Sequence, residues 1–235
     1  MKEREIDDVL AQTAQDAPAV SPALLEGIAA SIKPSLRPVR PMPPAWLLAS
    51  GLILIAVAVA LAGAAHAGFY GIERLTAFER LLIFPALALL LWAAASEFAA
   101  SMIPGSRRRM RPGVLLAISS LALMGVFAAV FRDYHTTHFV SAGIACLVVG
   151  LLHAIPVALL SWLLLRRGFA VNPVAAGAIA GTLAGLAGVT MLELHCPNFQ
   201  LLHVLVWHTA VLPAAAAAGI LTAWLFRLRG ASRRL

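Results

Sequence analysis

Residues 173–226 read PVAAGAIAGTLAGLAGVTMLELHCPNFQLLHVLVWHTAVLPAAAAAGILTAWLF. Two apolar runs in this stretch, 173–192 and 204–226, each approach the roughly 20 residues that an α-helix needs to cross a bilayer. The short segment between them concentrates side chains that bind metals or react with oxidants, and it contains no Lys or Arg. We therefore expect two membrane-spanning helices joined by a chemically active loop.

The composition extends this interpretation to the whole chain. Hydrophobic residues make up 61% of the 235 residues and charged residues 12%, whereas soluble domains average roughly 45–50% and 25%. The mean hydropathy is +0.87. Six apolar runs of spanning length lie at 46–65, 81–103, 113–131, 143–165, 173–192 and 204–226. The predicted fold class is all-α, a polytopic bundle of six transmembrane helices with a short helical segment before it.

The basic residues predict the orientation of these spans. The chain has 18 Lys and Arg and a net charge of +7, and its basic residues stand in short runs at the ends of the apolar segments. All of them except Arg74, Arg80 and Arg132 fall on the side that holds both termini. Because cytoplasmic loops carry the excess of Lys and Arg, both termini are predicted to be cytoplasmic. Topology thus explains the basic character, and we expect no direct binding to nucleic acid.

Residues 1–45 are predicted to be a cytoplasmic segment with two short amphipathic helices, because apolar residues recur there every three to four positions. The first helix covers about 3–14, and the second begins at an N-cap, Ser21-Pro22, and runs through Ile32. The apolar positions are Ile6, Val9 and Leu10 in the first helix, and Leu24, Leu25, Ile28 and Ile32 in the second. No apolar run typical of a cleavable signal peptide precedes them.

The same segment ends in a proline-rich tether and divides the chain into three parts. The predicted parts are the segment 1–45, a transmembrane domain 46–226 and a basic tail 227–235. Chains of about 40 residues rarely fold unaided. The segment therefore either solubilises the chain or lies on the membrane surface, or it docks on a partner protein and folds there. The two apolar stripes favour docking.

Both cysteines of the chain, Cys146 and Cys196, fall on the predicted non-cytoplasmic side. Glu193, His195 and His203 are expected in the same layer. Thiolate and imidazole are the ligands of zinc, cadmium and similar metals, and two thiols that face an oxidising compartment can form a disulfide instead. Either event would link the loop between spans five and six to the top of span four.

The loop sequence also predicts how the second thiol is presented. Pro197-Asn198 after Cys196 is typical of a sharp turn, which would expose the thiol at a loop tip. A simpler alternative stays open, since interfacial histidines commonly bind headgroups or water and a membrane cysteine is often a small apolar filler. Because Cys146 and Cys196 are predicted at one depth, we favour a metal or redox role for the pair.

Small residues in the fifth span predict close helix packing. Gly177, Gly181 and Gly185 follow one another at four-residue intervals, a small-xxx-small ladder that lets two helix backbones approach. We expect this ladder to pack within the chain rather than between two copies.

Two other classes of function are compatible with such a membrane protein. A thiol oxidoreductase generally needs a second redox pair, whereas this chain has two cysteines altogether. A metal or small-solute transporter usually shows repeat symmetry and polar groups at the middle of the membrane, and neither is evident here. A hydrolase constellation is also absent from the sequence, so we expect a protein that is not an enzyme.

Residues 101–105 read Ser-Met-Ile-Pro-Gly, and Glu193-x-His195-Cys196-Pro197-Asn198 is followed by His203 and by Trp207-His208. Together with six spans and a short N-terminal segment, these motifs resemble the NrsF family of bacterial anti-sigma factors, the negative regulators of sigma F. The resemblance covers essentially the whole chain, although the N-terminal segment matches only in length and amphipathic character.

This resemblance implies a bacterial inner-membrane protein. It would hold an extracytoplasmic-function sigma factor through the cytoplasmic N-terminal segment and release it under heavy-metal or oxidative stress. Cys146 and Cys196 occupy the places of the family's sensing cysteines. The implied partners are the sigma factor and the lipid bilayer. The resemblance implies no constitutive cofactor, and at most a heavy-metal ion that binds transiently.

Overall fold

The computed structural model describes residues 21–33, 43–103, 106, 109–167, 170 and 172–232. The chain divides into two compact units, Met1–Pro41 and Met42–Leu235, each of which is described by itself. Within the described residues all regular elements are helical, and one isolated bridge pairs Asp133 with Gln200.

In the first unit the structure describes one helix, α2 (Pro22–Ile32). Ser21 caps it, because its Oγ accepts a hydrogen bond from the backbone N–H of Leu24 at 3.2 Å, and Pro22 fills the first helical position. The predicted second helix is therefore confirmed, and its Leu24 and Leu25 are 56% and 54% exposed. The predicted first helix, with Ile6, Val9 and Leu10, lies outside the described residues.

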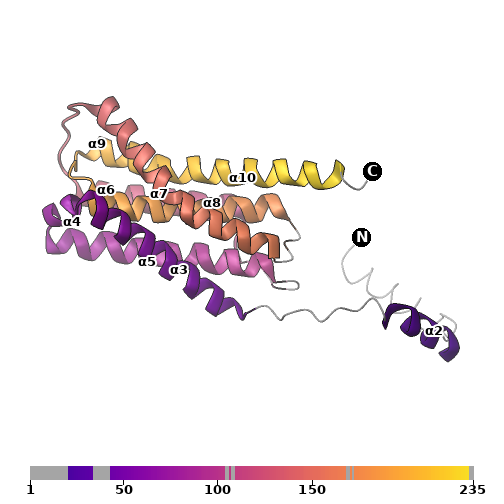
Figure 1. The fold of residues 1–235 in the computed structure, drawn as a ribbon. Helices are drawn as coiled ribbons and strands as arrows, with labels where there is room; N and C mark the ends of the chain where they lie inside the picture. The colour runs from indigo at the N-terminus through magenta and orange to yellow at the C-terminus, as the bar shows by residue number, and fades with distance from the viewer. Residues whose placement is uncertain are drawn as a thin grey trace, which may run out of the picture. The chain divides into compact units, whose positions relative to one another are not determined.

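Among the described residues, the second unit has six helical segments long and apolar enough to cross a membrane, as the composition predicted. Its helices are α3 (Ala45–Ala67), α4 (Tyr70–Arg74), α5 (Ala77–Met102), α6 (Pro112–Val130), α7 (Phe139–Arg167), α8 (Pro173–His195), α9 (Leu201–His203), the π-helix η2 (Val204–His208) and α10 (Thr209–Ser232). The last three form one continuous span (Figure 1). The fold class predicted from the sequence is confirmed.

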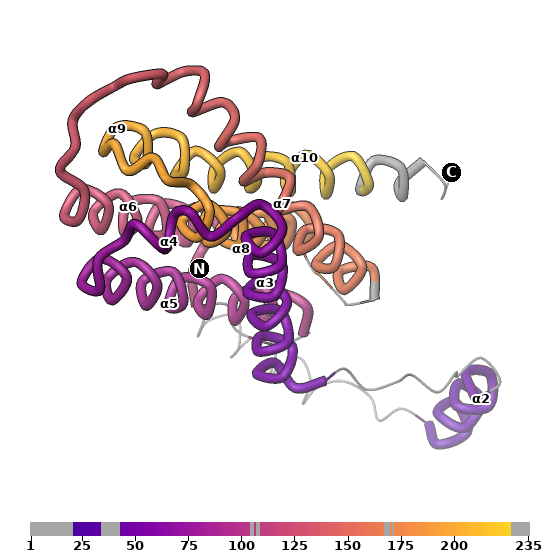
Figure 2. The backbone as a smooth tube through the Cα atoms, turned by 60° about the vertical axis from the view of Figure 1, so that its left-hand side comes forward, coloured from indigo at the N-terminus to yellow at the C-terminus, as the bar shows by residue number. Residues whose placement is uncertain are grey.

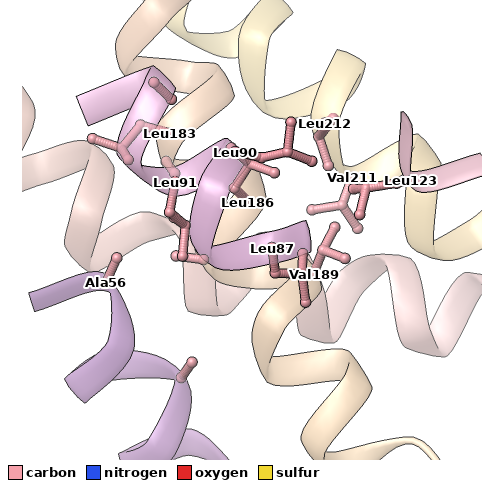
Figure 3. Close-up of a cluster of buried hydrophobic side chains, with 14 of the residues drawn as sticks. Ala56, Leu87, Leu90, Leu91, Leu123, Leu183, Leu186, Val189, Val211 and Leu212 are labelled. Carbon is pink, nitrogen blue, oxygen red and sulfur yellow. The ribbon is translucent and has the colours of Figure 1, made fainter. Parts of the chain in front are cut away.

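Helix α8 lies at the centre of this unit. In its most apolar window 78% of the residues are buried, against 22–39% in the other five spans, and it contacts α3, α5, α6, α7 and α10. Leu183 and Leu186 of α8 are fully buried in an aliphatic cluster with Leu87, Leu91 and Leu212 from its neighbours (Figure 3). In a bilayer such a cluster would be held by close packing rather than by exclusion of water, because lipid tails are as apolar as leucine.

The glycine ladder brings α8 directly against α10. A Cβ added to Gly181 would lie 2.3 Å from the carbonyl oxygen of Ala215, and one added to Gly177 would lie 2.5 Å from that of Gly219. Both distances are too short for any side chain, so the two backbones touch at these positions. The ladder packs within the chain, as predicted.

Two helix boundaries differ from the predicted ones for local reasons. Helix α5 starts at Ala77 rather than at 81, because Thr76 and Glu79 form a reciprocal capping box that adds a turn. Helix α8 runs to His195 rather than to 192, so Glu193 and His195 lie in its last turn and not in a loop. The connections α3–α5, α6–α7 and α8–α9 meet at one end of the bundle, opposite the start of α3 (Figures 1 and 2).

Candidate metal and redox site

The site lies at this end of the bundle, where α8 stops and the sixth span begins. Helix α8 ends at His195. The backbone N–H of the C-cap residue, Cys196, still donates to the carbonyl oxygen of Leu192 at 2.7 Å, and the following Pro197 cannot continue the helix. The short loop then turns into α9. Cys196 is only 3% exposed, so the predicted loop tip with an exposed thiol is wrong: the loop folds inward over the bundle.

The second thiol reaches this position from α7. Gly150 of α7 crosses Gly188 of α8 so closely that a Cβ on Gly188 would lie 2.3 Å from the Gly150 carbonyl oxygen. Cys146, one turn before that crossing, thereby comes beside the end of α8. Its Sγ lies 3.3 Å from the Sγ of Cys196, and both cysteines are free thiols.

Two imidazoles complete the cluster because the sixth span opens with a π-turn. In an α-helix, residues five apart point about 140° away from each other, whereas a π-turn closes with hydrogen bonds between residues five apart and brings them to one face. His203 and His208 flank this turn, and their ring centroids are 5.3 Å apart. Both side chains are fully buried. His203 is the last residue of α9 and not part of the predicted loop.

The donor atoms of Cys146, Cys196, His203 and His208 all lie within 4.8 Å of one another. The Nε2 of His203 is 3.7 Å from the Sγ of Cys196. The hydrogen bond with Cys146 and the burial of the sulfur raise the pKa of the Cys196 thiol above its ordinary range, an effect that the nearby His203 partly opposes. The Cys196 thiol is therefore protonated at neutral pH in the absence of a ligand.

Glu193 lies beside this cluster on the last turn of α8. Its Oε1 is 2.6 Å from the Nδ1 of His208, and neither side chain is exposed to any extent. Three buried atoms here have no hydrogen-bond partner among the described residues: Glu193 Oε2, His203 Nδ1 and His208 Nε2. A buried polar atom without a partner is costly, which marks this pocket as one arranged for something besides packing.

His195, predicted in the same layer, is not part of the cluster. Its Nδ1 lies 2.9 Å from the carbonyl oxygen of Gly68, and its ring packs against Tyr70 with centroids 5.9 Å apart. Arg74 donates to the carbonyl oxygen of Pro197 at 3.2 Å. His195 thus fastens the segment that carries Cys196 to the end of α3 and to α4.

Helix α4 makes a second, tighter contact with the same segment. A Cβ added to Gly71 would lie 2.6 Å from the carbonyl oxygen of Glu193 and 2.9 Å from that of Cys196. We call this contact of Gly68, Tyr70, Gly71 and Arg74 with residues 193–197 the α4 clamp.

A third group of polar residues lies on the exposed α6–α7 connection. Asp133 accepts hydrogen bonds from the backbone N–H of His135 at 3.0 Å and from its ring at 2.5 Å. These bonds hold the pKa of Asp133 below its ordinary value. The Asp133 carbonyl oxygen also accepts from the backbone N–H of Leu201 at 2.6 Å, which ties this connection to the start of α9.

Sequence reasoning placed Cys146, Cys196, Glu193 and His203 in one layer, and the structure brings these four together. Sequence reasoning named His208 only as part of the Trp207-His208 motif and not as a member of this layer, whereas the structure includes His208 in the cluster. His208 lies five residues after His203, and this spacing does not place two side chains on one face of an α-helix. The π-turn that brings them together has no recognisable sequence motif.

Chemically, two thiols and two imidazoles within this distance suit a soft or borderline divalent metal. The thiols alone are also near enough to form a disulfide after a small movement. The residues therefore fit the transient heavy-metal ion that the sequence implied, and they fit a two-electron oxidation as well.

The comparison with known families agrees with the motifs of this site. The family model described as NrsF, negative regulator of sigma F, matches residues 34–228. No curated protein and no solved structure shows a significant match to the chain. The match includes every residue of the cluster and begins at residue 34, just after α2.

Proposed function

The chain belongs to the NrsF family of negative regulators of sigma F, and we propose that it is an inner-membrane anti-sigma factor switched by its two cysteines. It would hold an extracytoplasmic-function sigma factor through its N-terminal segment and release it when a heavy metal or an oxidant reaches Cys146 and Cys196. The family match is the single observation that carries this proposal, since it makes the chain a negative regulator of a sigma factor.

The N-terminal segment supplies the surface for the sigma factor. Leu24, Leu25 and Ile28 lie on one side of α2 and are all exposed, between 46% and 56%. An amphipathic helix of this kind binds by laying its apolar side into a groove of its partner. The predicted apolar residues Ile6, Val9 and Leu10 would extend this surface. Access of the sigma factor to polymerase core would be blocked as long as the segment is bound.

The charge distribution supports the topology. Because most Lys and Arg flank the ends of the spans on the side of the termini, both termini would lie in the cytoplasm and the cysteine cluster on the periplasmic side. The start of α3, which follows the tether, and the cluster lie at opposite ends of the bundle (Figure 1). A signal at the cluster would thus be read on the far side of the membrane.

Oxidation of the thiols and metal binding can each supply enough free energy to shift such a switch. Two thiols oxidised to a disulfide release two electrons and two protons, which an oxidant of the peroxide class takes up as it is reduced to water or alcohol. A chelated metal instead displaces the two thiol protons. Changing a bound fraction from 1:99 to 99:1 needs about 5.5 kcal/mol of differential affinity, which several coordinate bonds supply. The cysteines would sense in this scheme and carry no catalysis.

Capture of a sigma factor tests the first half of the proposal. The full chain, purified in detergent, would be incubated with the sigma factors of its own cell, and the retained protein identified. Wild type should retain one sigma factor, and the double variant Leu24→Asp, Ile28→Asp should lose it. The double variant Ala23→Asp, Ala30→Asp adds the same two charges on the opposite side of α2 and serves as the matched control. Equal retention by all three proteins would rule out this surface.

Release tests the second half. Cadmium or hydrogen peroxide added to the wild-type complex should free the sigma factor, whereas the complex of Cys196→Ser should stay bound under both treatments. If the serine variant released its sigma factor at the wild-type rate, the cysteines would not be the sensor.

A further inference from the structure

The unpartnered nitrogen beside the thiol pair distinguishes between the two signals. A disulfide between Cys146 and Cys196 would consume the sulfurs and leave His208 Nε2 buried without a partner, as it is now. A metal ion bound by all four side chains would give this nitrogen a partner, and His203 would coordinate through Nε2, the nitrogen that lies 3.7 Å from Cys196 Sγ. The surroundings of the thiols are therefore built for coordination.

The geometry of the cluster fits one coordination type. An ion with ligand distances of about 2.0–2.3 Å and tetrahedral angles has its donor atoms about 3.3–3.8 Å apart. The two sulfurs are already 3.3 Å apart, and Cys196 Sγ and His203 Nε2 are 3.7 Å apart. The donor atoms of all four residues lie within 4.8 Å of one another. Small side-chain rotations would bring the four donor atoms to tetrahedral positions around one ion.

Glu193 gives the fourth ligand its orientation. Its Oε1 lies 2.6 Å from His208 Nδ1, so a neutral imidazole donates its Nδ1–H to the carboxylate and leaves the lone pair on Nε2. That nitrogen belongs to the cluster. A carboxylate behind a metal-binding histidine fixes its tautomer and makes it a better donor.

We propose that Cys146, Cys196, His203 and His208 form a tetrahedral site for a divalent ion of the zinc class, and that Glu193 is a positioning residue for His208. This inference rests on the proposed function for its biological meaning, since it names the ligand that the switch detects. The ion has two charges, which the two thiolates balance after their protons have left. Hard cations such as Mg²⁺ and Ca²⁺ prefer oxygen ligands and are excluded.

The probe for this site is Co²⁺, which occupies tetrahedral zinc sites and reports its ligands by visible absorption. The full chain in detergent, with its thiols reduced, should bind one Co²⁺ and show both thiolate charge-transfer and tetrahedral ligand-field bands. His203→Ala and His208→Ala should each weaken binding at least tenfold, and Glu193→Gln should weaken it about 10–100-fold with altered bands. His66→Ala is the matched control, because it removes an exposed histidine of α3 that is not part of the cluster, and it should bind as wild type does.

X-ray absorption of wild type loaded with Zn²⁺ needs no variant and therefore no assumption about folding. Two sulfur and two nitrogen ligands are expected, at about 2.3 Å and 2.0–2.1 Å. Two sulfurs with oxygen ligands only, or wild-type Co²⁺ binding by His208→Ala, would overturn the inference.

The two proposals fail separately. Sigma capture is measured without metal, so a chain that captures sigma but lacks this coordination refutes the site alone. A chain that coordinates Co²⁺ as described but retains no sigma factor refutes the proposed function and leaves the site standing.

Discussion

Helices α8 and α2 both carry many apolar side chains, yet those of α8 are mostly buried and those of α2 are exposed. In α8, 78% of the most apolar window is buried among the neighbouring helices, whereas α2 has no buried residue at all. An exposed apolar stripe often marks a surface that binds another molecule. Under the proposed function, α8 serves packing and sensing, and α2 serves recognition.

The largest effect is expected where α8 has no room. Gly181→Leu would force a side chain into the backbone of α10, with its Cβ 2.3 Å from the Ala215 carbonyl oxygen, so the bundle cannot close. We expect loss of the monodisperse folded protein in detergent, measured by size-exclusion chromatography and thermal unfolding. Gly125→Leu is the control, because nothing lies within 4 Å of a Cβ at that position. A well-folded Gly181→Leu would show that α8 is not tightly held.

A smaller effect is expected at the α4 clamp, where α8 meets the first span. Gly71→Ala places a methyl group 2.6 Å and 2.9 Å from the carbonyl oxygens of Glu193 and Cys196, and overpacking of this kind typically costs about 1–3 kcal/mol. Because the displaced backbone carries Glu193 and Cys196, Co²⁺ affinity should fall at least severalfold. Capture of the sigma factor without metal should not change.

The control for the clamp is Gly113→Ala, whose added Cβ meets nothing within 4 Å. Unchanged Co²⁺ affinity in Gly71→Ala would show that the 193–197 segment is positioned by other contacts.

The sequence predicted the apolar framework well because its signals are local. Run length placed the six spans, and Ser21-Pro22 fixed the start of α2. What it missed depends on three-dimensional packing. Pro197-Asn198 predicted an exposed turn, but Cys196 is buried because the loop folds back over the bundle. The apolar run predicted for the second span began at 81, but the capping box of Thr76 and Glu79 starts the helix at Ala77.

The four residues of the cluster show most clearly what could not be predicted from the sequence. His195 is the histidine adjacent to Cys196, yet it points to Gly68, and His208, twelve residues from Cys196, completes the cluster. Only the π-turn at 204–208 brings His203 and His208 to one side, and ordinary helical periodicity separates them. Proximity in sequence therefore selected the wrong histidine.

A modest effect on stability is expected from the exposed α6–α7 connection, which lies outside both α8 and α2. Hydrogen bonds from His135 lower the pKa of Asp133, so the ionised carboxylate stabilises the fold above its unfolded pKa, ordinarily about 3.9. This contribution is lost as the pH falls through the lower folded pKa. Asp133→Asn should lower the unfolding temperature slightly at pH 7, and the difference from wild type should shrink in acid. A difference independent of pH would assign the loss to something other than ionisation.

The smallest effect on stability is expected from a substitution in α2, where, in contrast to α8, loss of binding should occur without loss of the fold. Leu25 is 54% exposed, so Leu25→Asp removes little buried area and should change the free energy of unfolding of the bundle by no more than about 0.5 kcal/mol. The same charge would meet the apolar groove of a bound sigma factor, where desolvation of an unpaired carboxylate opposes binding. Thermal unfolding and sigma capture on one preparation separate the two consequences. A bundle destabilised by several kcal/mol would mean that α2 packs on its own chain, and α2 would then resemble α8 after all.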